Sequence, residues 1–166
     1  MRRFIFRLQY LVLASSLFLL GSPAPWAAQS DWPPPPSRLD LPTPYGELHI
    51  KPSEYIYESR LRVNNVDVSP EIEGILNITY AFATPHAHAA LISINSGNDQ
   101  CPMTYRWIIL NEKGYKVSPV FGSCSPRIKV FATRRTFVVE TPSDRKPDKI
   151  DIYVYDGKTI KHRTKP

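Results

Sequence analysis

The fold class of this chain is decided by the stretch Met103-Thr104-Tyr105-Arg106-Trp107-Ile108-Ile109. Every second side chain from Met103 to Ile109 is apolar, and Thr104 and Arg106 lie between them. Successive side chains of a strand point to opposite faces, so this alternation is typical of a half-buried antiparallel strand. No segment after residue 30 shows a convincing helical period.

The same alternation recurs along the rest of the chain. It appears at residues 55–63, 76–82, 127–132 and 151–155, and shorter strands are predicted at 47–50, 89–95, 115–121, 136–141 and 158–162. Turn signals separate several of these segments, among them Asn111-Glu112-Lys113-Gly114, Thr133-Arg134-Arg135 and Asp156-Gly157. The pattern predicts an all-β fold: a single-domain antiparallel β-sandwich or partly open barrel over residues 46–162.

The N-terminus has the order of a signal peptide. Three arginines precede an apolar stretch at residues 8–20, and small residues follow up to Ala28. The apolar stretch has about 13 residues, whereas a helix that crosses a bilayer needs roughly 20. We therefore expect residues 1–28 to be cleaved, which leaves a periplasmic or secreted protein without a transmembrane span. An uncleaved membrane anchor is the alternative.

Removal of residues 1–28 changes the meaning of the charge. The formal net charge falls from +6 to +3, because three arginines and no acids are lost. Four of the remaining cations are in residues 158–166, so residues 29–157 carry a formal charge of −1. A nucleic-acid partner is not expected, because such proteins carry a basic stripe on the folded body.

Proline dominates the segment that follows the signal peptide. Residues 29–45 include the run Pro33-Pro34-Pro35-Pro36, which favours an extended polyproline II chain. We expect this leader to lie outside the sheets of the domain, and residues 163–166 to form a basic tail. Trp32 would either bind a partner or pack on the body of the domain, and the second is favoured.

Two cysteines, Cys101 and Cys124, are present in the chain. In an exported protein a single pair predicts one structural disulfide. The alternative is a nucleophilic cysteine with a histidine partner, which requires that the other cysteine stay free in an oxidising compartment. We therefore predict that the two cysteines are joined.

The chain shows no strong catalytic, cofactor or metal signature. His86 and His88 would share a face of a strand and could bind a metal, but no third ligand is near in sequence. Glu71 and Glu73 fit a solvated surface, and Ser123 lies in a turn beside a cysteine. We assign no catalytic, cofactor-binding or metal-binding residue, and expect the protein not to be an enzyme.

Two tyrosines near the C-terminus allow two interpretations. Tyr153 and Tyr155 alternate with Ile152 and Val154. They would form either an exposed aromatic strip for a carbohydrate or protein, or a packed layer beneath the C-terminal segment. Packing is favoured.

A group of short motifs resembles a layout found in small single-disulfide periplasmic proteins of Gram-negative bacteria. The motifs are Gly97-Asn98-Asp99-Gln100-Cys101-Pro102, Tyr105-Arg106-Trp107, Val117-Ser118-Pro119, Phe121-Gly122-Ser123-Cys124-Ser125 and Tyr153-Val154-Tyr155-Asp156-Gly157. Proteins of this kind include candidates for immunity partners of exported toxins. The resemblance implies a protein partner in the periplasm or envelope.

These observations favour a non-enzymatic interaction protein of the cell envelope, such as an inhibitor or immunity protein that binds a toxin or hydrolase. The contact surface is expected among the loops at 83–88, 95–102 and 122–126. The alternative is a ligand-binding module for envelope glycan or a metal. A hydrolase with unrecognised residues is a third hypothesis.

Overall fold

The computed structural model describes residues 32–54, 59–133 and 136–166 of the chain. Within these residues the protein is all-β, with 13 strands in three antiparallel sheets and no helix. The predicted fold class is confirmed. The predicted signal peptide, Tyr55 and Tyr57 lie outside the described residues.

The first sheet, here called the N-terminal sheet, follows the chain without a crossover. Its strands are β1 (Asp40–Thr43), β2 (Gly46–Pro52), β3 (Ser59–Val63) and β4 (Val66–Asp67). Asn64 and Asn65 have φ angles of 51° and 66° and join β3 to β4, as the type I′ turn of a two-residue hairpin requires. Leu48, Ile50 and Leu61 are buried on the inner face of this sheet.

The second sheet, here called the central sheet, holds the longest strands. It contains β5 (Ile75–Thr84), β6 (Ala87–Asn95), β7 (Met103–Asn111), β8 (Gly114–Val117) and β9 (Phe121–Cys124). Both β8 and β9 pair with β7, one after the other. The predicted strand at 115–121 is therefore two strands, and the break falls at Pro119, which has no backbone N–H for the ladder.

The third sheet, here called the C-terminal sheet, is a meander of hairpins. Its strands are β10 (Lys129–Ala132), β11 (Phe137–Pro142), β12 (Ile150–Tyr155) and β13 (Ile160–Lys165). Because β13 continues to Lys165, the prediction that residues 163–166 form a separate tail is wrong. Arg163, Thr164 and Lys165 have ladder partners on β12, which hold this segment in the sheet.

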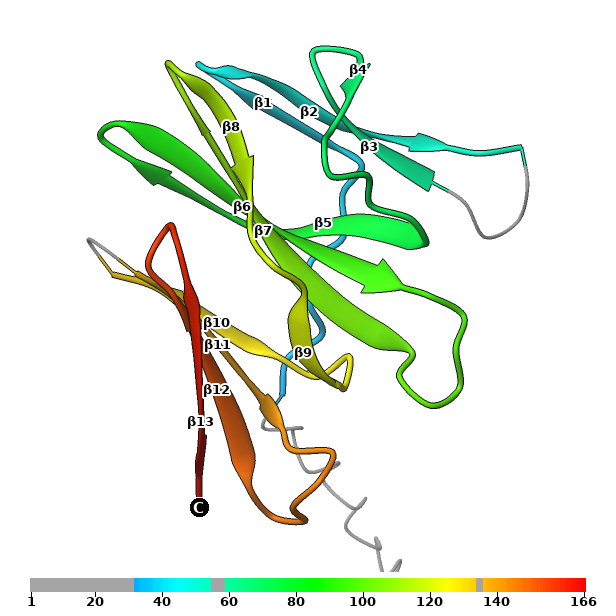
Figure 1. Ribbon diagram of the computed structural model, residues 1–166, viewed down its shortest axis with the longest axis vertical. Helices are drawn as coiled ribbons and strands as arrows, with labels where there is room; N and C mark the ends of the chain where they lie inside the picture. The colour runs from blue at the N-terminus through cyan, green and yellow to red at the C-terminus, as the bar shows by residue number, and fades with distance from the viewer. Residues whose placement is uncertain (1–31, 55–58, 134–135) are drawn as a thin grey trace, which may run out of the picture.

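The central sheet lies between the other two, so the sandwich has three layers (Figure 1). Ala90, Ile92 and Ile94 of β6 face the core shared with the N-terminal sheet. Ala89 and Leu91 face the core shared with the C-terminal sheet. A strand that is buried on both faces needs apolar side chains on both, which explains the nearly unbroken apolar run in β6.

The proline-rich leader contacts all three layers. Lys129 of β10 places its Nζ 4.9 Å from the centre of the Trp32 ring, so the prediction that Trp32 packs on the body is confirmed. Arg38 forms a β-bridge with Ile78 of β5, and β1 belongs to the N-terminal sheet. The prediction that the leader lies outside the sheets is thus wrong. Pro42 is tolerated because β1 is an edge strand.

Candidate functional site

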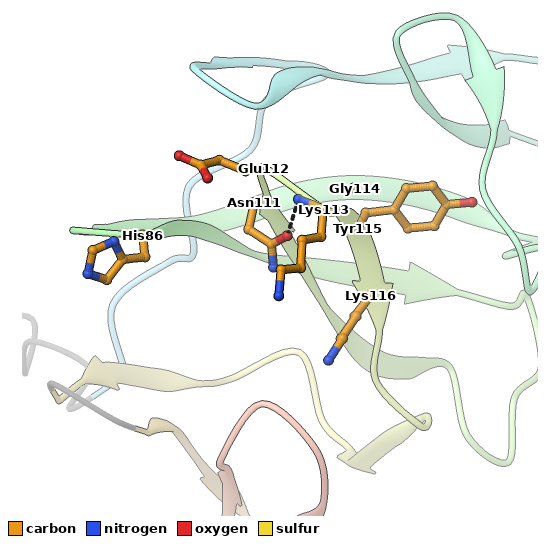
Figure 2. Close-up of a pocket in the computed structure, with 7 residues that line it drawn as sticks. All are labelled: His86, Asn111, Glu112, Lys113, Gly114, Tyr115 and Lys116. Atoms are coloured by element: carbon orange, nitrogen blue, oxygen red, sulfur yellow. Dashed lines mark hydrogen bonds between the residues drawn. The ribbon is translucent and has the colours of Figure 1, made fainter.

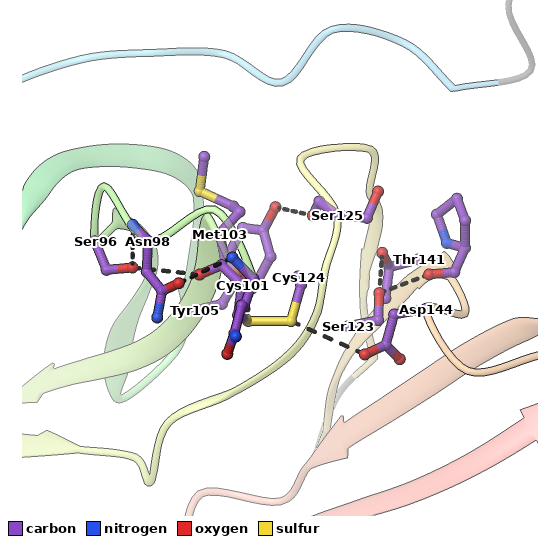
Figure 3. Close-up of a disulfide and its surroundings, with 12 residues drawn as sticks. Ser96, Asn98, Cys101, Met103, Tyr105, Ser123, Cys124, Ser125, Thr141 and Asp144 are labelled. Carbon is purple, nitrogen blue, oxygen red and sulfur yellow. Dashed lines mark hydrogen bonds between the residues drawn. A yellow bond between two sulfur atoms is a disulfide. The ribbon is translucent and has the colours of Figure 1, made fainter.

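The predicted disulfide lies at one end of the central sheet. Cys101 and Cys124 are joined, and their Cα atoms are 4.5 Å apart, which confirms the pairing. The bond connects the loop at 96–102 to the end of β9 (Figure 3). Within this loop, Asn98 accepts a hydrogen bond from the backbone of Gln100, and Ser96 donates to the carbonyl of Cys101. The loop is thus held by its own hydrogen bonds as well as by the disulfide.

Ser123 links the central sheet to the C-terminal sheet beside the disulfide. Its buried hydroxyl donates to the Pro142 carbonyl at 2.6 Å, and it lies 2.9 Å from Thr141 Oγ1 (Figure 3). Tyr105 of β7 fixes the turn after β9, because its hydroxyl donates to the carbonyl of Ser125. These bonds give Ser123 a structural role in joining the two sheets.

A polar cavity of about 450 Å³ opens next to the disulfide, and we call it the disulfide-end cavity. Its lining comes from the two cysteines, the loop between β11 and β12, and the facing strands β12 and β13: Cys101, Gly122, Cys124, Ser143, Asp144, Arg145, Lys146, Asp151, Tyr153, His162 and Thr164. Asp144 Oδ2 lies 4.0 Å from Cys124 Sγ, so the loop that carries Asp144 borders the disulfide (Figure 3). Residues far apart in the sequence therefore meet at this end of the molecule.

A buried carboxylate forms the floor of the disulfide-end cavity. Thr164 donates its hydroxyl to Asp151 Oδ1 at 2.6 Å, and His162 Nε2 lies 3.0 Å from the same oxygen. Burial alone would raise the pKa of Asp151, but hydrogen bonds from Thr164, His162 and Ser143 outweigh it and lower the pKa below 3.8. Asp151 is therefore an anion at neutral pH.

Tyr153 forms the apolar side of the same cavity. Its ring stacks on His162 with centroids 4.6 Å apart, and it also contacts Phe121. Burial and the neighbouring carboxylates of Asp151 and Asp144 raise the pKa of Tyr153 to about 12. Tyr155 is fully buried in the core. The favoured prediction, that these tyrosines pack beneath the C-terminal segment, is confirmed, and the exposed aromatic strip is wrong.

Several polar groups of the disulfide-end cavity are already engaged within the protein. The two cysteines are joined in the disulfide, and the Thr164 hydroxyl donates a hydrogen bond to Asp151. The Tyr153 hydroxyl stays protonated at neutral pH because of its raised pKa. The charged groups of Asp144, Arg145 and Lys146 lie in the same lining and suit hydrogen bonds and ion pairs.

The two histidines at the other end of the central sheet have different surroundings. His86 borders a separate cavity of about 450 Å³, formed with residues 111–116 of the β7–β8 hairpin (Figure 2). His88 places its ring edge against Tyr45 of the N-terminal sheet, with centroids 5.9 Å apart. Within residues 32–54, 59–133 and 136–166, no group of three histidine, cysteine, aspartate or glutamate side chains is placed to hold a metal ion.

The glutamates considered in the sequence lie on the surface. Glu71 forms an ion pair with Arg60 at 3.0 Å, and Glu73 is exposed. The structure places neither of them at the disulfide-end cavity.

The pair Asp151 and His162 was missed by sequence reasoning. A signal for it existed in the predicted turn at Asp156-Gly157, although the connection between β12 and β13 spans residues 156–159 and β13 begins at Ile160 instead of residue 158. The hairpin register sets Asp151 opposite Thr164 and Tyr153 opposite His162. Because residues two apart share a face, Asp151 and His162 come together diagonally.

No family model, curated protein or solved structure matches this chain. In the described part of the chain, no helix is long and apolar enough to cross a membrane.

Proposed function

We propose that this protein works by binding another protein of the cell envelope, as an inhibitor or immunity protein does, and that the disulfide end is its contact surface. By disulfide end we mean the loops at 96–102 and 143–149 together with the turn at 124–126. One observation carries the proposal: the Cys101–Cys124 bond and the Ser123 hydrogen bonds fix these loops, which come from two sheets, at one end of the molecule.

The physical reason is the entropy of binding. A loop that is mobile when free must be ordered in the complex, and that ordering reduces affinity. The disulfide and the bond network remove much of this cost before the partner arrives. The rim also carries both signs of charge, with Asp144 beside Arg145 and Lys146, which supports selection among partners.

Export to the periplasm or the cell exterior belongs to the same proposal. A disulfide persists in an oxidising compartment and is rare in the cytosol. The Cys101–Cys124 bond therefore fits an exported protein, in keeping with the signal-peptide pattern of residues 1–28. The resemblance to small single-disulfide periplasmic proteins, which include candidates for immunity partners, supports a toxin or hydrolase as the bound protein.

A second candidate function is supported by the disulfide-end cavity itself. Its volume of about 450 Å³ is within the range of small-molecule sites, and its lining is rich in polar groups. A fragment of envelope glycan is the ligand that this alternative predicts. Isothermal titration calorimetry with soluble peptidoglycan fragments tests it directly. A saturable heat of binding in the absence of any protein partner would favour this function.

Capture from native envelope extract tests the proposed contact. The bait is the mature chain, residues 29–166, and the test variant carries Arg145→Glu with Lys146→Glu at the rim. A matched control reverses the same number of charges, Lys113→Glu with Lys116→Glu, on the β7–β8 hairpin. At about 3.3 Å per residue, the nine residues of β7 separate that hairpin from the disulfide by roughly 25–30 Å.

The proposal expects one protein to be captured by the wild-type bait and by the control, and to be lost from the rim variant. Equal capture by all three baits would overturn the assignment of the disulfide end. Absence of any captured protein, together with binding of glycan fragments, would favour the second candidate.

A further inference from the structure

Strand β13 is the outer strand of the C-terminal sheet and has six residues. The other sheet edges in the described residues are shorter or covered. β1, β8, β9 and β10 have four residues each, and β4 has two. The long edge of β5 is bridged by the leader at Arg38, which exchanges two backbone hydrogen bonds with Ile78. Among the described residues, β13 is therefore the longest sheet edge that no other segment bridges.

The alternation of hydrogen-bonded and non-bonded residue pairs in the β12–β13 hairpin shows which backbone groups face outward. The backbone N–H of Asp156 donates to the Thr159 carbonyl at 3.3 Å, which makes Asp156–Thr159 a hydrogen-bonded pair. In an antiparallel ladder such pairs alternate with non-bonded ones. The next pair, Tyr155–Ile160, is then non-bonded, and so are Tyr153–His162 and Asp151–Thr164. Ile160, His162 and Thr164 consequently turn their backbone groups to the open edge.

The side chains of β13 give this edge a charge. Lys161 and Arg163 are exposed on the outer face of the sheet, and they alternate with Ile160 and His162, which face the central sheet. Lys165 continues the cationic row and pairs with Glu140 of β11 at 2.7 Å. Lys161 and Arg163 stand directly opposite Val154 and Ile152, which are uncharged. The acids that act on this row lie at its ends, Asp156 near Lys161 and Glu140 at Lys165.

We propose that the open edge of β13 binds an extended acidic segment of a protein partner as an additional antiparallel strand. Backbone hydrogen bonds to Ile160, His162 and Thr164 would supply the attachment, as in other cases of strand addition. Directly opposite side chains lie about 5 Å apart, so an acidic residue at every second position would face the cationic row. The residues between them would face the side of Ile160 and His162. This inference rests on the proposed function, since it assumes a protein partner and specifies its chemistry.

A second copy of this chain is a poor occupant of the same edge. Antiparallel pairing of two β13 strands would set the cationic rows of both copies side by side, and like charges opposite one another destabilise a pair. Charge on an edge strand commonly prevents such self-association. An acidic partner turns that repulsion into attraction.

Peptide binding followed by nuclear magnetic resonance tests the proposal on the mature protein. The probe is a synthetic peptide in which glutamate alternates with valine, and its control is an isomer with the glutamates grouped at one end. The alternating peptide should shift the backbone amide signals of Ile160, His162 and Thr164 and bind more tightly than the isomer. Lys161→Glu with Arg163→Glu should weaken binding by about ten-fold or more, whereas Lys113→Glu with Lys116→Glu should not.

Two outcomes would overturn the proposal: equal binding of the two peptides, or binding that the Lys161 and Arg163 reversal leaves unchanged in a variant whose remaining spectrum is that of the wild type. Binding to vesicles that contain phosphatidylglycerol, lost in the same variant while neither peptide binds, would overturn it in favour of a lipid surface. Failure of the proposed function would be seen elsewhere, in the capture experiment with Arg145 and Lys146 reversed.

Discussion

Asp151 is the most deeply buried acid of the disulfide-end cavity, and its neighbours explain how a carboxylate is kept there. The Thr164 hydroxyl and the His162 ring both bind Oδ1, so the charge is hydrogen-bonded instead of stranded in the protein. The two partners come from β13, and Asp151 comes from β12. The carboxylate therefore holds the last strand of the protein in place.

Asp151→Asn should lower the free energy of unfolding by about 1–3 kcal/mol at neutral pH, because hydrogen bonds to a charged group are lost or weakened. The pKa of Asp151 is lower in the folded protein than its usual 3.8, so its stabilising effect is complete above that value. The effect is lost as the pH falls through the lowered pKa. Urea unfolding at about pH 7 and about pH 2 checks this, and a difference between the two proteins that persists undiminished in acid would contradict it.

The disulfide offers a second test at the same scale. Replacement of both Cys101 and Cys124 by alanine should lower the free energy of unfolding by about 2–5 kcal/mol, because the unfolded chain is no longer constrained. Urea unfolding measures the loss, with Ser125→Ala as a control in the same turn that keeps the bond. A double variant as stable as the wild type would show that the bond adds nothing to stability.

At the residue scale, the sequence carried enough information for the cysteines but not for the acid and histidine. The pairing of Cys101 with Cys124 follows from their number and from the signs of export. Asp151 and His162 become neighbours only through the register of a hairpin, and their residue types are common on surfaces. The burial of Asp151 depends on packing against the central sheet, which composition does not report.

Strand β6 shows at the element scale why the molecule has three layers. Neighbouring side chains of this strand enter different cores, Leu91 on the side of the C-terminal sheet and Ile92 on the side of the N-terminal sheet. Both are fully buried. In a sandwich of two layers, one of two such neighbours would face solvent.

Leu91→Ala and Ile92→Ala should each lower the free energy of unfolding by about 2–5 kcal/mol, because each leaves a cavity in a packed core. Ile75→Ala is the matched control, since Ile75 lies at the start of β5 and is exposed. Its replacement should change stability by less than about 0.5 kcal/mol. Thermal or urea unfolding compares the three, and a near-neutral result for either Leu91 or Ile92 would contradict the three-layer arrangement.

The leader provides the second test at this scale. Arg38→Pro should lower the free energy of unfolding by about 1–3 kcal/mol, because proline cannot donate the backbone hydrogen bond that Arg38 gives to Ile78. Arg38→Ala keeps that donor and should be close to wild type. Unfolding of the two variants in urea separates the contribution of the Arg38 backbone from that of its side chain. Equal stability of both variants would show that the bridge does not hold the leader.

Strand positions were predictable from the sequence because alternation survives wherever one face is buried. The stretch at 103–109 became β7, and 76–82 became the middle of β5. β1 escaped for a physical reason, since it contains Pro42, which usually argues against a strand. β6 was predicted at 89–95, but its burial on both faces was not, and the third layer was missed for that reason.

At the scale of the whole molecule, three sheets and one leader hold the disulfide end in place. The leader touches β10 through Trp32, crosses β5 at Arg38 and ends as β1. Ser123 connects β9 to the end of β11, and the disulfide connects the loop at 96–102 to the end of β9. A scaffold tied in this way suits a protein whose task is to present a fixed surface.

The most direct test of contact against catalysis is a paired measurement on His162→Gln, with partner affinity and complementation of a strain that lacks the gene determined on the same variant. If the protein acts by contact, biological function and affinity for the captured partner fall together and in proportion. The variant with Arg145→Glu and Lys146→Glu should show the same proportion between function and affinity. Complete loss of function in a folded His162→Gln variant that still binds its partner with wild-type affinity would contradict the account and assign a chemical role to the Asp151–His162 pair.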